Sequence, residues 1–177
     1  HYNSTGTYSG DLSLTTDSKD TVFSPVKLTP AYLPDGSVAS SDRGPDKYSV
    51  PSDTESSSHD TVFSLYKMDT DDFTFSQSYM TSREEFNANG NDAVLMTFDS
   101  STAFDKTAYV IFQKLGYVVE INMGNAITHE EAKKIASGVT LTPATDSDAT
   151  FAGSLSELKT ELAEDAAAPK DLQTTWL

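Results

Sequence analysis

The stretch that decides the fold runs from Thr107 to Gly138 and reads TAYVIFQKLGYVVEINMGNAITHEEAKKIASG. Its first part, Tyr109 to Phe112, is a run of aromatic and β-branched residues without a polar face, which predicts a strand inside a sheet. A turn is predicted at Lys114 to Gly116. In the return strand, Tyr117 to Met123, apolar residues fill the odd-numbered positions, so we expect that only this face is buried.

A helix is predicted directly after this hairpin. Thr128 suits an N-cap, and Glu131 completes a capping box with it. Ile127 is placed to pack against Ala132 as a hydrophobic staple. The apolar stripe of the helix consists of Ala132, Ile135, Ala136 and Val139. Gly138 predicts a left-handed helix end, so the whole stretch indicates a sheet with a helix packed on it.

Two earlier segments have strand patterns and are predicted to pair with each other. Val62–Met68 and Phe73–Tyr79 read as a hairpin across the acidic residues 69–72. The aromatic residues Phe73, Phe75 and Tyr79 share one face of the second strand. This spacing favours a place in the core, with a ligand platform as the alternative.

The next segment combines a turn signal with a buried strand. Asn89 and Gly90 predict a type I′ hairpin turn, and Ala93–Phe98 follows as an apolar strand. Before the turn, Ser82 and Glu85 have the spacing of a capping box, which predicts a short helical turn.

These patterns indicate an α+β fold on a mainly antiparallel sheet, with a packed helix after the last hairpin and an additional C-terminal helix. We expect one domain over residues 20–142, with a flexible connection at 37–59, where Ser, Asp and Pro dominate. Residues 1–19 read as a polar lead-in or tether that is dispensable for stability, with a possible edge strand at Asp11–Thr15. Residues 143–177 are expected to form a linker, the second helix and a tail.

The C-terminal helix is predicted from its two ends. Ser154 and Glu157 form a second capping-box pattern, and Pro169 ends the helix after about residue 168. The narrow apolar stripe consists of Leu155, Leu158, Leu162 and Ala166. Such a stripe either covers the second face of the sheet or meets a partner protein.

Composition restricts the function classes. A formal net charge of −15, with only 12 Lys and Arg residues, argues against a nucleic-acid partner, whose phosphates require clustered basic side chains. There is no cysteine, so disulfides and thiolate sites are excluded. No apolar run approaches the ~20 residues of a membrane helix. Because the chain begins at His1 without a methionine, we expect any membrane anchor to lie upstream of this sequence.

Motifs for catalysis and metal binding are incomplete. His129 opens a helix like that of a zinc protease, but the position of the second histidine is Lys133. His59 lies in a Ser-rich segment, and neither a nucleophile elbow nor a phosphate-binding loop is present. We therefore predict no enzyme, no catalytic residue, no metal-binding residue and no cofactor, and leave the binding residues open. Paired carboxylates, which only the fold can bring together, are the open route to a hydrolase.

Two smaller features have open interpretations. Asp69, Asp71 and Asp72 offer carboxylates for calcium, but the spacing of an EF-hand is absent and a solvated hairpin tip is the alternative. Trp176, close to the end of the sequence, either anchors on the domain or extends from it.

The order of these features resembles a domain of unknown function found in Firmicute extracytoplasmic proteins, including anti-sigma-factor-like membrane proteins and predicted lipoproteins. The residues that carry the resemblance are Tyr32–Gly36, Phe73–Ser78, Asn89–Val94, Gly116–Ile121 and Thr128–Ala136. The resemblance spans about residues 28–140. Residues 37–59 and the helix after Ser154 depart from that family's pattern.

The resemblance implies a non-enzymatic sensing or protein-binding module of a cell-surface protein that is anchored to the membrane, anchored by a lipid or secreted. Its expected partners are proteins, peptides or hydrophobic ligands of a Gram-positive cell envelope, without nucleic acid. The first alternative is a carrier of a hydrophobic ligand or acyl chain in a sheet-lined cavity. The second is a secreted hydrolase that uses carboxylates. A ligand-sized apolar cavity favours the carrier, and a filled core with an exposed apolar edge favours the binding module.

Overall fold

The computed structural model of the protein describes residues 8–15, 23–39, 46–50, 58–70, 72–99 and 104–167. Its strands are β1 (Tyr8–Thr15), β2 (Val26–Pro30), β3 (Val38–Ala39), β4 (Asp46–Ser49), β5 (Thr61–Lys67), β6 (Asp72–Ala88), β7 (Asn91–Phe98), β8 (Phe104–Phe112), β9 (Tyr117–Gly124), β10 (Val139–Pro143) and β11 (Ala152–Ser154). Its helices are α1 (His129–Ser137) and α2 (Leu155–Ala167).

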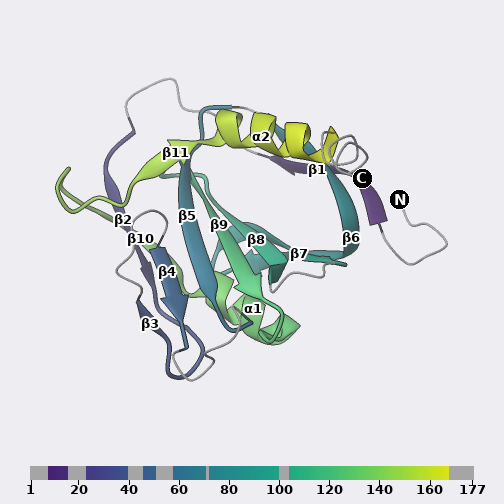
Figure 1. Ribbon diagram of the computed structural model, residues 1–177. Helices are drawn as coiled ribbons and strands as arrows, with labels where there is room; N and C mark the ends of the chain where they lie inside the picture. Colours follow the sequence, from purple (N-terminus) through teal and green to yellow (C-terminus); the bar gives the residue numbers. More distant parts are fainter. Residues whose placement is uncertain are drawn as a thin grey trace, which may run out of the picture.

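One large sheet organises the molecule. Its strands follow the order β1-β6-β7-β8-β9-β5-β4-β3, and β11 adds to β5 as well. Neighbouring strands are antiparallel, except that β11 runs parallel to β5. Strands β2 and β10 form a separate two-stranded sheet. Figure 1 shows the long strand β6 bending, with α2 along one face of the sheet and α1 at the other. The predicted α+β class with a mainly antiparallel sheet is confirmed.

The hairpin β8–β9 lies in the middle of the sheet, as its apolar runs predict. Phe112 pairs with Tyr117 across the predicted turn, where Gly116 adopts φ of 81°. The prediction that β9 has only one buried face is wrong, because Val118 and Glu120 are buried as well. The physical reason is α2, which packs on the face that the alternating pattern left open.

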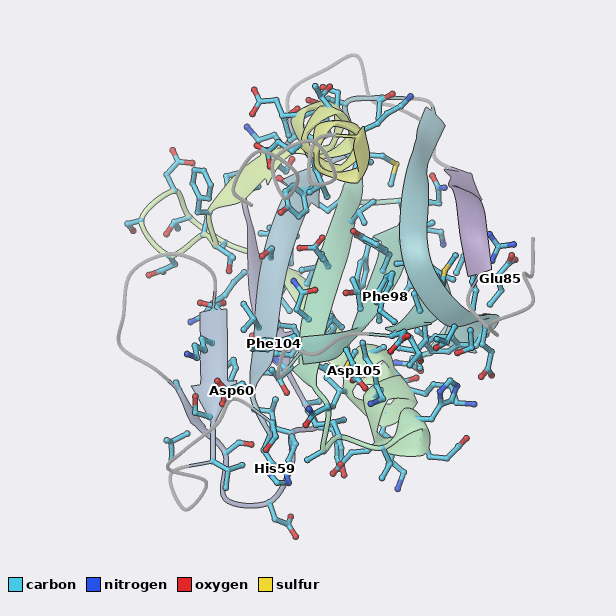
Figure 2. All side chains as sticks on the ribbon, turned by 45° about the vertical axis from the view of Figure 1, so that its right-hand side comes forward. His59, Asp60, Glu85, Phe98, Phe104 and Asp105 are labelled. Atoms are coloured by element: carbon cyan, nitrogen blue, oxygen red, sulfur yellow. The ribbon has the colours of Figure 1, made fainter. Side chains whose placement is uncertain are left out.

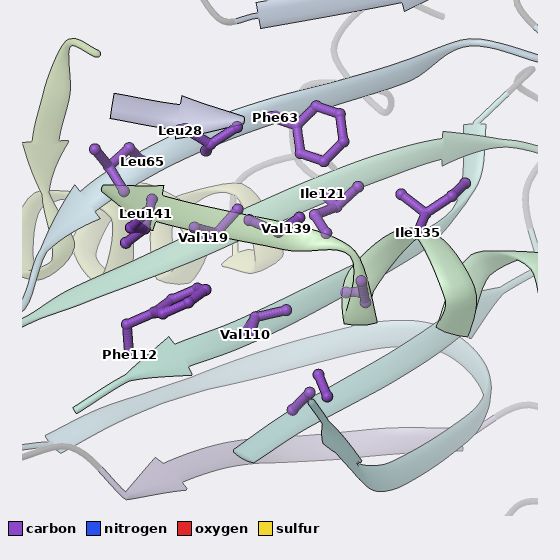
Figure 3. Close-up of a cluster of buried hydrophobic side chains, with 14 of the residues drawn as sticks. Leu28, Phe63, Leu65, Val110, Phe112, Val119, Ile121, Ile135, Val139 and Leu141 are labelled. Atoms are coloured by element: carbon purple, nitrogen blue, oxygen red, sulfur yellow. The ribbon is translucent and has the colours of Figure 1, made fainter. Parts of the chain in front are cut away.

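The first core lies on the α1 face of the sheet. Figure 3 shows the labelled side chains of β2, β5, β8, β9, β10 and α1 meeting there. The predicted N-cap is confirmed, since Thr128 Oγ1 accepts a hydrogen bond from the backbone N–H of Glu131 at 3.1 Å. The predicted left-handed end is wrong, because Gly138 has φ of −91°. Glycine fits for another reason: a Cβ there would lie 3.0 Å from the backbone nitrogen of Tyr32.

The second core lies between α2 and the opposite face. Leu155 and Leu158 of α2 are buried there against Met68, Met80 and other side chains of β6 to β9. Figure 2 shows side chains filling this space, with Phe98 on the inner side of the sheet. The apolar stripe of the C-terminal helix was expected either to cover the second face of the sheet or to meet a partner protein. Its described side chains, Leu155 and Leu158, cover the sheet.

The predicted hairpin between residues 62–68 and 73–79 is wrong. Strand β5 pairs with β9 on one edge and with β4 and β11 on the other, whereas β6 pairs with β7 and β1. The register of β5 on β9 places Phe63 beside Ile121 and Leu65 beside Val119, so it fills the first core with large apolar side chains. The side chains of residues 72–79, including the aromatic series, lie outside the described residues.

The segment around Asn89 shows one confirmed and one wrong prediction. Asn89 and Gly90 have φ of 53° and 96°, the backbone of a type I′ turn, and they join β6 to β7. The predicted helical turn at Ser82 and Glu85 is a strand instead, because β7 pairs with β6 along this length, with Glu84 beside Leu95.

The segments expected to be tethers or connections contain strands. The edge strand predicted at Asp11–Thr15 is present and extends to Tyr8. Strands β3 and β4 lie within the expected flexible connection at 37–59, and β11 lies within the expected linker. Residues 1–7, 16–19, 40–45, 51–57 and 168–177 of these segments, with Trp176, lie outside the described residues.

Candidate functional site

The outer edge of β5 is shared by two short strands that begin at almost the same point and run apart. Asp46, the first residue of β4, pairs with Phe63. Ala152, the first residue of β11, pairs with Leu65. Ser64 lies between these pairs and, within the described strands, is matched in neither ladder. The sheet edge is therefore interrupted at one residue.

A pocket of about 500 Å³ lies at this interruption. We call it the edge pocket, and it is lined by Lys27, Leu28, Asp46, Tyr48, Phe63, Ser64, Leu65, Tyr66, Asp148, Ala149, Thr150, Phe151 and Gly153. Strand β5 contributes Phe63, Ser64, Leu65 and Tyr66 to the lining, which are the residues on both sides of the interruption. The edge pocket therefore lies where the ladders of β4 and β11 begin.

One wall of the edge pocket is a loop that is fixed to β2. The backbone N–H of Thr150 donates to the carbonyl of Val26 at 2.9 Å. The Thr150 hydroxyl in turn accepts from the backbone N–H of Leu28 at 2.9 Å. These two bonds position Phe151, whose side chain is 86% exposed beside the edge pocket. A single exposed apolar side chain is common on protein surfaces, so Phe151 indicates a contact surface only through its position in the lining of the edge pocket.

The edge pocket combines aromatic rings with charge. Tyr48 and Phe63 pack edge to face, with ring centroids 5.7 Å apart. Asp46 is half-buried; burial raises its pKa, and the positive charge of Lys27 acts in the opposite direction. Burial and the charge of Asp46 raise the pKa of Tyr48. The site therefore offers one partly desolvated carboxylate among apolar surfaces.

A buried polar network lies on the α2 face of the neighbouring strands. Tyr109 Oη donates to Glu120 Oε2 at 2.7 Å, and Asn122 Nδ2 lies 3.3 Å from Glu120 Oε1. Thr107 Oγ1 donates to Asn122 Oδ1 at 2.8 Å. None of the ion pairs among the described residues involves Glu120, which is 8% exposed. Burial raises the pKa of Glu120, although its hydrogen bonds from Tyr109 and Asn122 oppose this shift.

Tyr66 connects the network with the edge pocket. It lines the edge pocket, and burial followed by the negative charge of Glu120 raises its pKa to about 12. A phenol with such a high pKa is neutral across the physiological range, so Tyr66 offers a hydroxyl and not a charge.

The histidines singled out from the sequence lie elsewhere. His129 Nε2 is 2.7 Å from Glu84 Oε1, and Lys133 Nζ is 3.0 Å from the other oxygen of the same carboxylate. These contacts join α1 to β6 through the carboxylate of Glu84, with Lys133 as its ion-pair partner. His59 Nδ1 lies 3.5 Å from the hydroxyl of Ser58, and Figure 2 places it near Asp60 at the lower end of the sheet. Among the described residues, no three His, Asp or Glu side chains are grouped so that they could hold a metal.

The carboxylate of Asp69 has a structural role at the start of α2. Asp69 Oδ1 accepts from the backbone N–H of Ser156 at 2.9 Å, and Oδ2 accepts from the hydroxyl of Ser154. The Ser154 hydroxyl also accepts from the backbone N–H of Glu157 at 3.2 Å, which confirms that predicted cap. The calcium hypothesis needs Asp71 and the side chain of Asp72, and both lie outside the described residues.

Sequence reasoning missed the edge pocket because its parts are far apart in the chain. Asp46 and Tyr48 lie in a segment that was expected to be a flexible connection, and Phe151 lies in an expected linker. One signal was present, since Tyr48 and Val50 alternate with Lys47 and Ser49 as in a short strand. The parallel pairing of β11 with β5 has no comparable local signal.

Comparisons of this chain with protein-family models, with curated proteins and with solved structures found no match. The resemblance to the Firmicute extracytoplasmic domain therefore stays a prediction. Of the described helices, neither is long and apolar enough to cross a membrane.

Proposed function

We propose that this protein is a non-enzymatic binding module of the cell envelope that holds part of a partner molecule in the edge pocket. The observation that carries the proposal is an open pocket of about 500 Å³ at the interrupted edge of β5, with the exposed Phe151 beside it. Pockets of roughly 300 to 1,000 Å³ are the usual size of ligand sites. A pocket with one exposed aromatic side chain in its lining suits recognition of a partner by apolar contact.

The filled second core supports a binding module over a carrier with an internal cavity. Val94, Val118, Met68 and Met80 have no exposed surface on the face where a sheet-lined cavity would lie. Helix α2 supplies Leu155 to the same cluster. An acyl chain that entered this space would have to displace packed side chains, which costs free energy.

A carrier remains the second candidate because of the lining of the edge pocket. Leu28, Phe63, Leu65 and Phe151 give it apolar walls, and its volume fits a small hydrophobic molecule. In this alternative the ligand occupies the edge pocket and not the space beneath α2. We propose the same extracytoplasmic location for both candidates, with which the formal net charge of −15 and the lack of cysteine are compatible.

The test is an NMR titration of the full chain with two named probes, a mixed pool of short peptides and laurate. We expect the peptide pool to shift amide signals of β5, β11 and residues 148–151. Phe151→Ala should weaken this response, whereas Leu115→Ala, which removes an exposed apolar side chain from a distant hairpin, should leave it unchanged. Shifts with laurate alone would favour the carrier. No shift with either probe, or shifts confined to other surfaces, would overturn the proposed site.

The hydrolase alternative is testable at the same place, because Asp46 and Asp148 both line the edge pocket. We expect no turnover of chromogenic glycoside or ester substrates by the full chain. Turnover that disappears in both Asp46→Asn and Asp148→Asn would instead establish carboxylate catalysis.

A further inference from the structure

We propose that the edge pocket takes a peptide segment that inserts a lysine or arginine side chain beside Asp46. This inference rests on the proposed binding function and names the chemistry of the partner. It follows from the charge of the edge pocket, from its aromatic lining and from the shape of the sheet edge.

The carboxylate of Asp46 is half-buried at the start of β4. Among the described side chains that line the edge pocket, the one cation is Lys27, which is exposed. A partly desolvated carboxylate is stabilised when a cation approaches it, because the cation replaces the lost hydration. Burial raises the pKa of Asp46, which agrees with a carboxylate whose lost hydration is only partly replaced by the charge of Lys27. An incoming ammonium or guanidinium group supplies the missing stabilisation of the negative charge.

The aromatic side chains of the edge pocket differ in exposure. Tyr48 is half-buried and packs edge to face on Phe63, which is buried, and the exposed Phe151 belongs to the same lining. Organic cations are attracted to the faces of aromatic rings, and the long methylene stems of lysine and arginine pack on apolar surfaces. A carboxylate next to aromatic rings therefore favours a basic side chain over an acidic or purely apolar one. The formal net charge of −15 attracts basic partners at longer range.

The edge of β5 leaves little room for the backbone of a partner. Within the described strands, only Ser64 lies between the β4 and β11 ladders, so β5 offers one residue without a strand partner on this edge and not a row of them. A bound peptide strand needs several consecutive backbone positions, which this edge does not provide. The peptide is therefore expected to cross the sheet edge and to anchor by a side chain. Its neighbouring residues then meet the exposed ring of Phe151.

The experiment uses pools of short synthetic peptides that are random except for one fixed central residue, with binding to the full chain measured by fluorescence anisotropy. Pools with central Arg or Lys should bind about tenfold more tightly than the pool with central Gln, and the Glu pool should bind most weakly. Raising sodium chloride from about 20 mM to about 300 mM should reduce this preference, because salt screens the charge interaction.

Two charge-neutralising variants separate the effect of the Asp46 carboxylate in the edge pocket from the effect of the net charge of the protein. Asp46→Asn should remove most of the preference for the Arg pool over the Gln pool, because the other carboxylate in the lining, that of Asp148, is exposed. Asp92→Asn removes the same charge from an exposed position at the distant β6–β7 hairpin and should keep the preference. If Asp46→Asn does not fold, as judged by its thermal melt, Lys27→Glu replaces it. That change adds negative charge to the rim and should increase the Arg-to-Gln ratio.

The outcomes distinguish this inference from the proposed function. Equal binding of all pools, with a loss in Phe151→Ala, would overturn the basic-residue inference and leave the binding module in place. A preference that Asp46→Asn and Asp92→Asn reduce equally would also overturn it, because the selectivity would then come from net charge. Failure of every pool, together with an absence of NMR shifts with laurate, would overturn both proposals.

Discussion

The central strands β8 and β9 of the large sheet are buried on both faces, but the two faces are built from different side chains. The α1 face has an apolar set that includes Phe63, Val110 and Ile121. The α2 face combines three methionines and Val118 with the hydrogen-bonded pair of Tyr109 and Glu120. The comparison shows that a polar residue in an alternating strand pattern does not indicate exposure. Such a residue can be buried when a neighbouring strand supplies a hydrogen-bond partner and a distant helix covers it.

The largest expected effect is on the α1 face. Ile121→Ala should lower the free energy of unfolding by about 2 to 5 kcal/mol, because it leaves a cavity among close-packed side chains of β5, β8 and α1. Urea denaturation followed by circular dichroism measures this loss. As the control, Leu115→Ala at an exposed turn should change stability by less than about 0.5 kcal/mol. Similar values for the two variants would contradict the assignment of the first core.

The second prediction places the same kind of truncation on the α2 face. Leu155→Ala should lower the free energy of unfolding by about 2 to 3 kcal/mol, at the lower end of the range for buried leucines. The reason is that Met68, Met80 and Met96 line this core, and flexible methionine side chains adapt to a small cavity. A loss larger than that of Ile121→Ala would show that the second core is the more rigid one.

How far the sequence predicts these faces depends on where their parts lie in the chain. The β8–β9 hairpin, the Asn89-Gly90 turn and the Thr128 cap are local patterns, and each was predicted from a few neighbouring residues. The pairing of β5 with β9 and the packing of α2 against Val118 join distant segments, so no local period specifies them. The edge pocket was not predicted because it depends on the pairing of β5 with β4 and with β11, which are not adjacent patterns in the sequence.

The third prediction concerns the start of α2. Asp69→Ala should lower the free energy of unfolding by about 1 kcal/mol, because the backbone N–H of Ser156 and the hydroxyl of Ser154 lose their acceptor. Asp69→Asn keeps an oxygen at this position and should lose less. Equal losses in thermal or urea unfolding would mean that the charge of Asp69, and not its hydrogen bonding, supports the helix.

The last and smallest expected effect is a change in pH dependence that comes from Glu120. Burial raises its pKa in the folded protein, so the folded state holds this proton to a higher pH than the unfolded chain, whose glutamate titrates near 4.5. The contribution of Glu120 to the free energy of unfolding is therefore fully present below the pKa of the unfolded chain. It is lost as the pH rises through the pKa of the folded protein. Within the part of the chain that the structure describes, the groups that interact with Glu120 are Tyr109, Tyr66, Asn122 and Glu161, and none of these four is a cation.

Glu120→Gln isolates this contribution, because glutamine keeps the shape of the side chain and an acceptor for the Tyr109 hydroxyl. Between about pH 4 and pH 8, the natural protein should lose stability relative to the variant as pH rises. Titrations of other groups occur in both proteins and cancel in this difference, including that of Glu84, whose pKa is lowered by its hydrogen bonds from His129 and Lys133. Urea midpoints at a series of pH values, with exposed Glu130→Gln as control, measure the difference. Parallel pH profiles for the natural protein and Glu120→Gln would show that α2 does not keep water from the carboxylate.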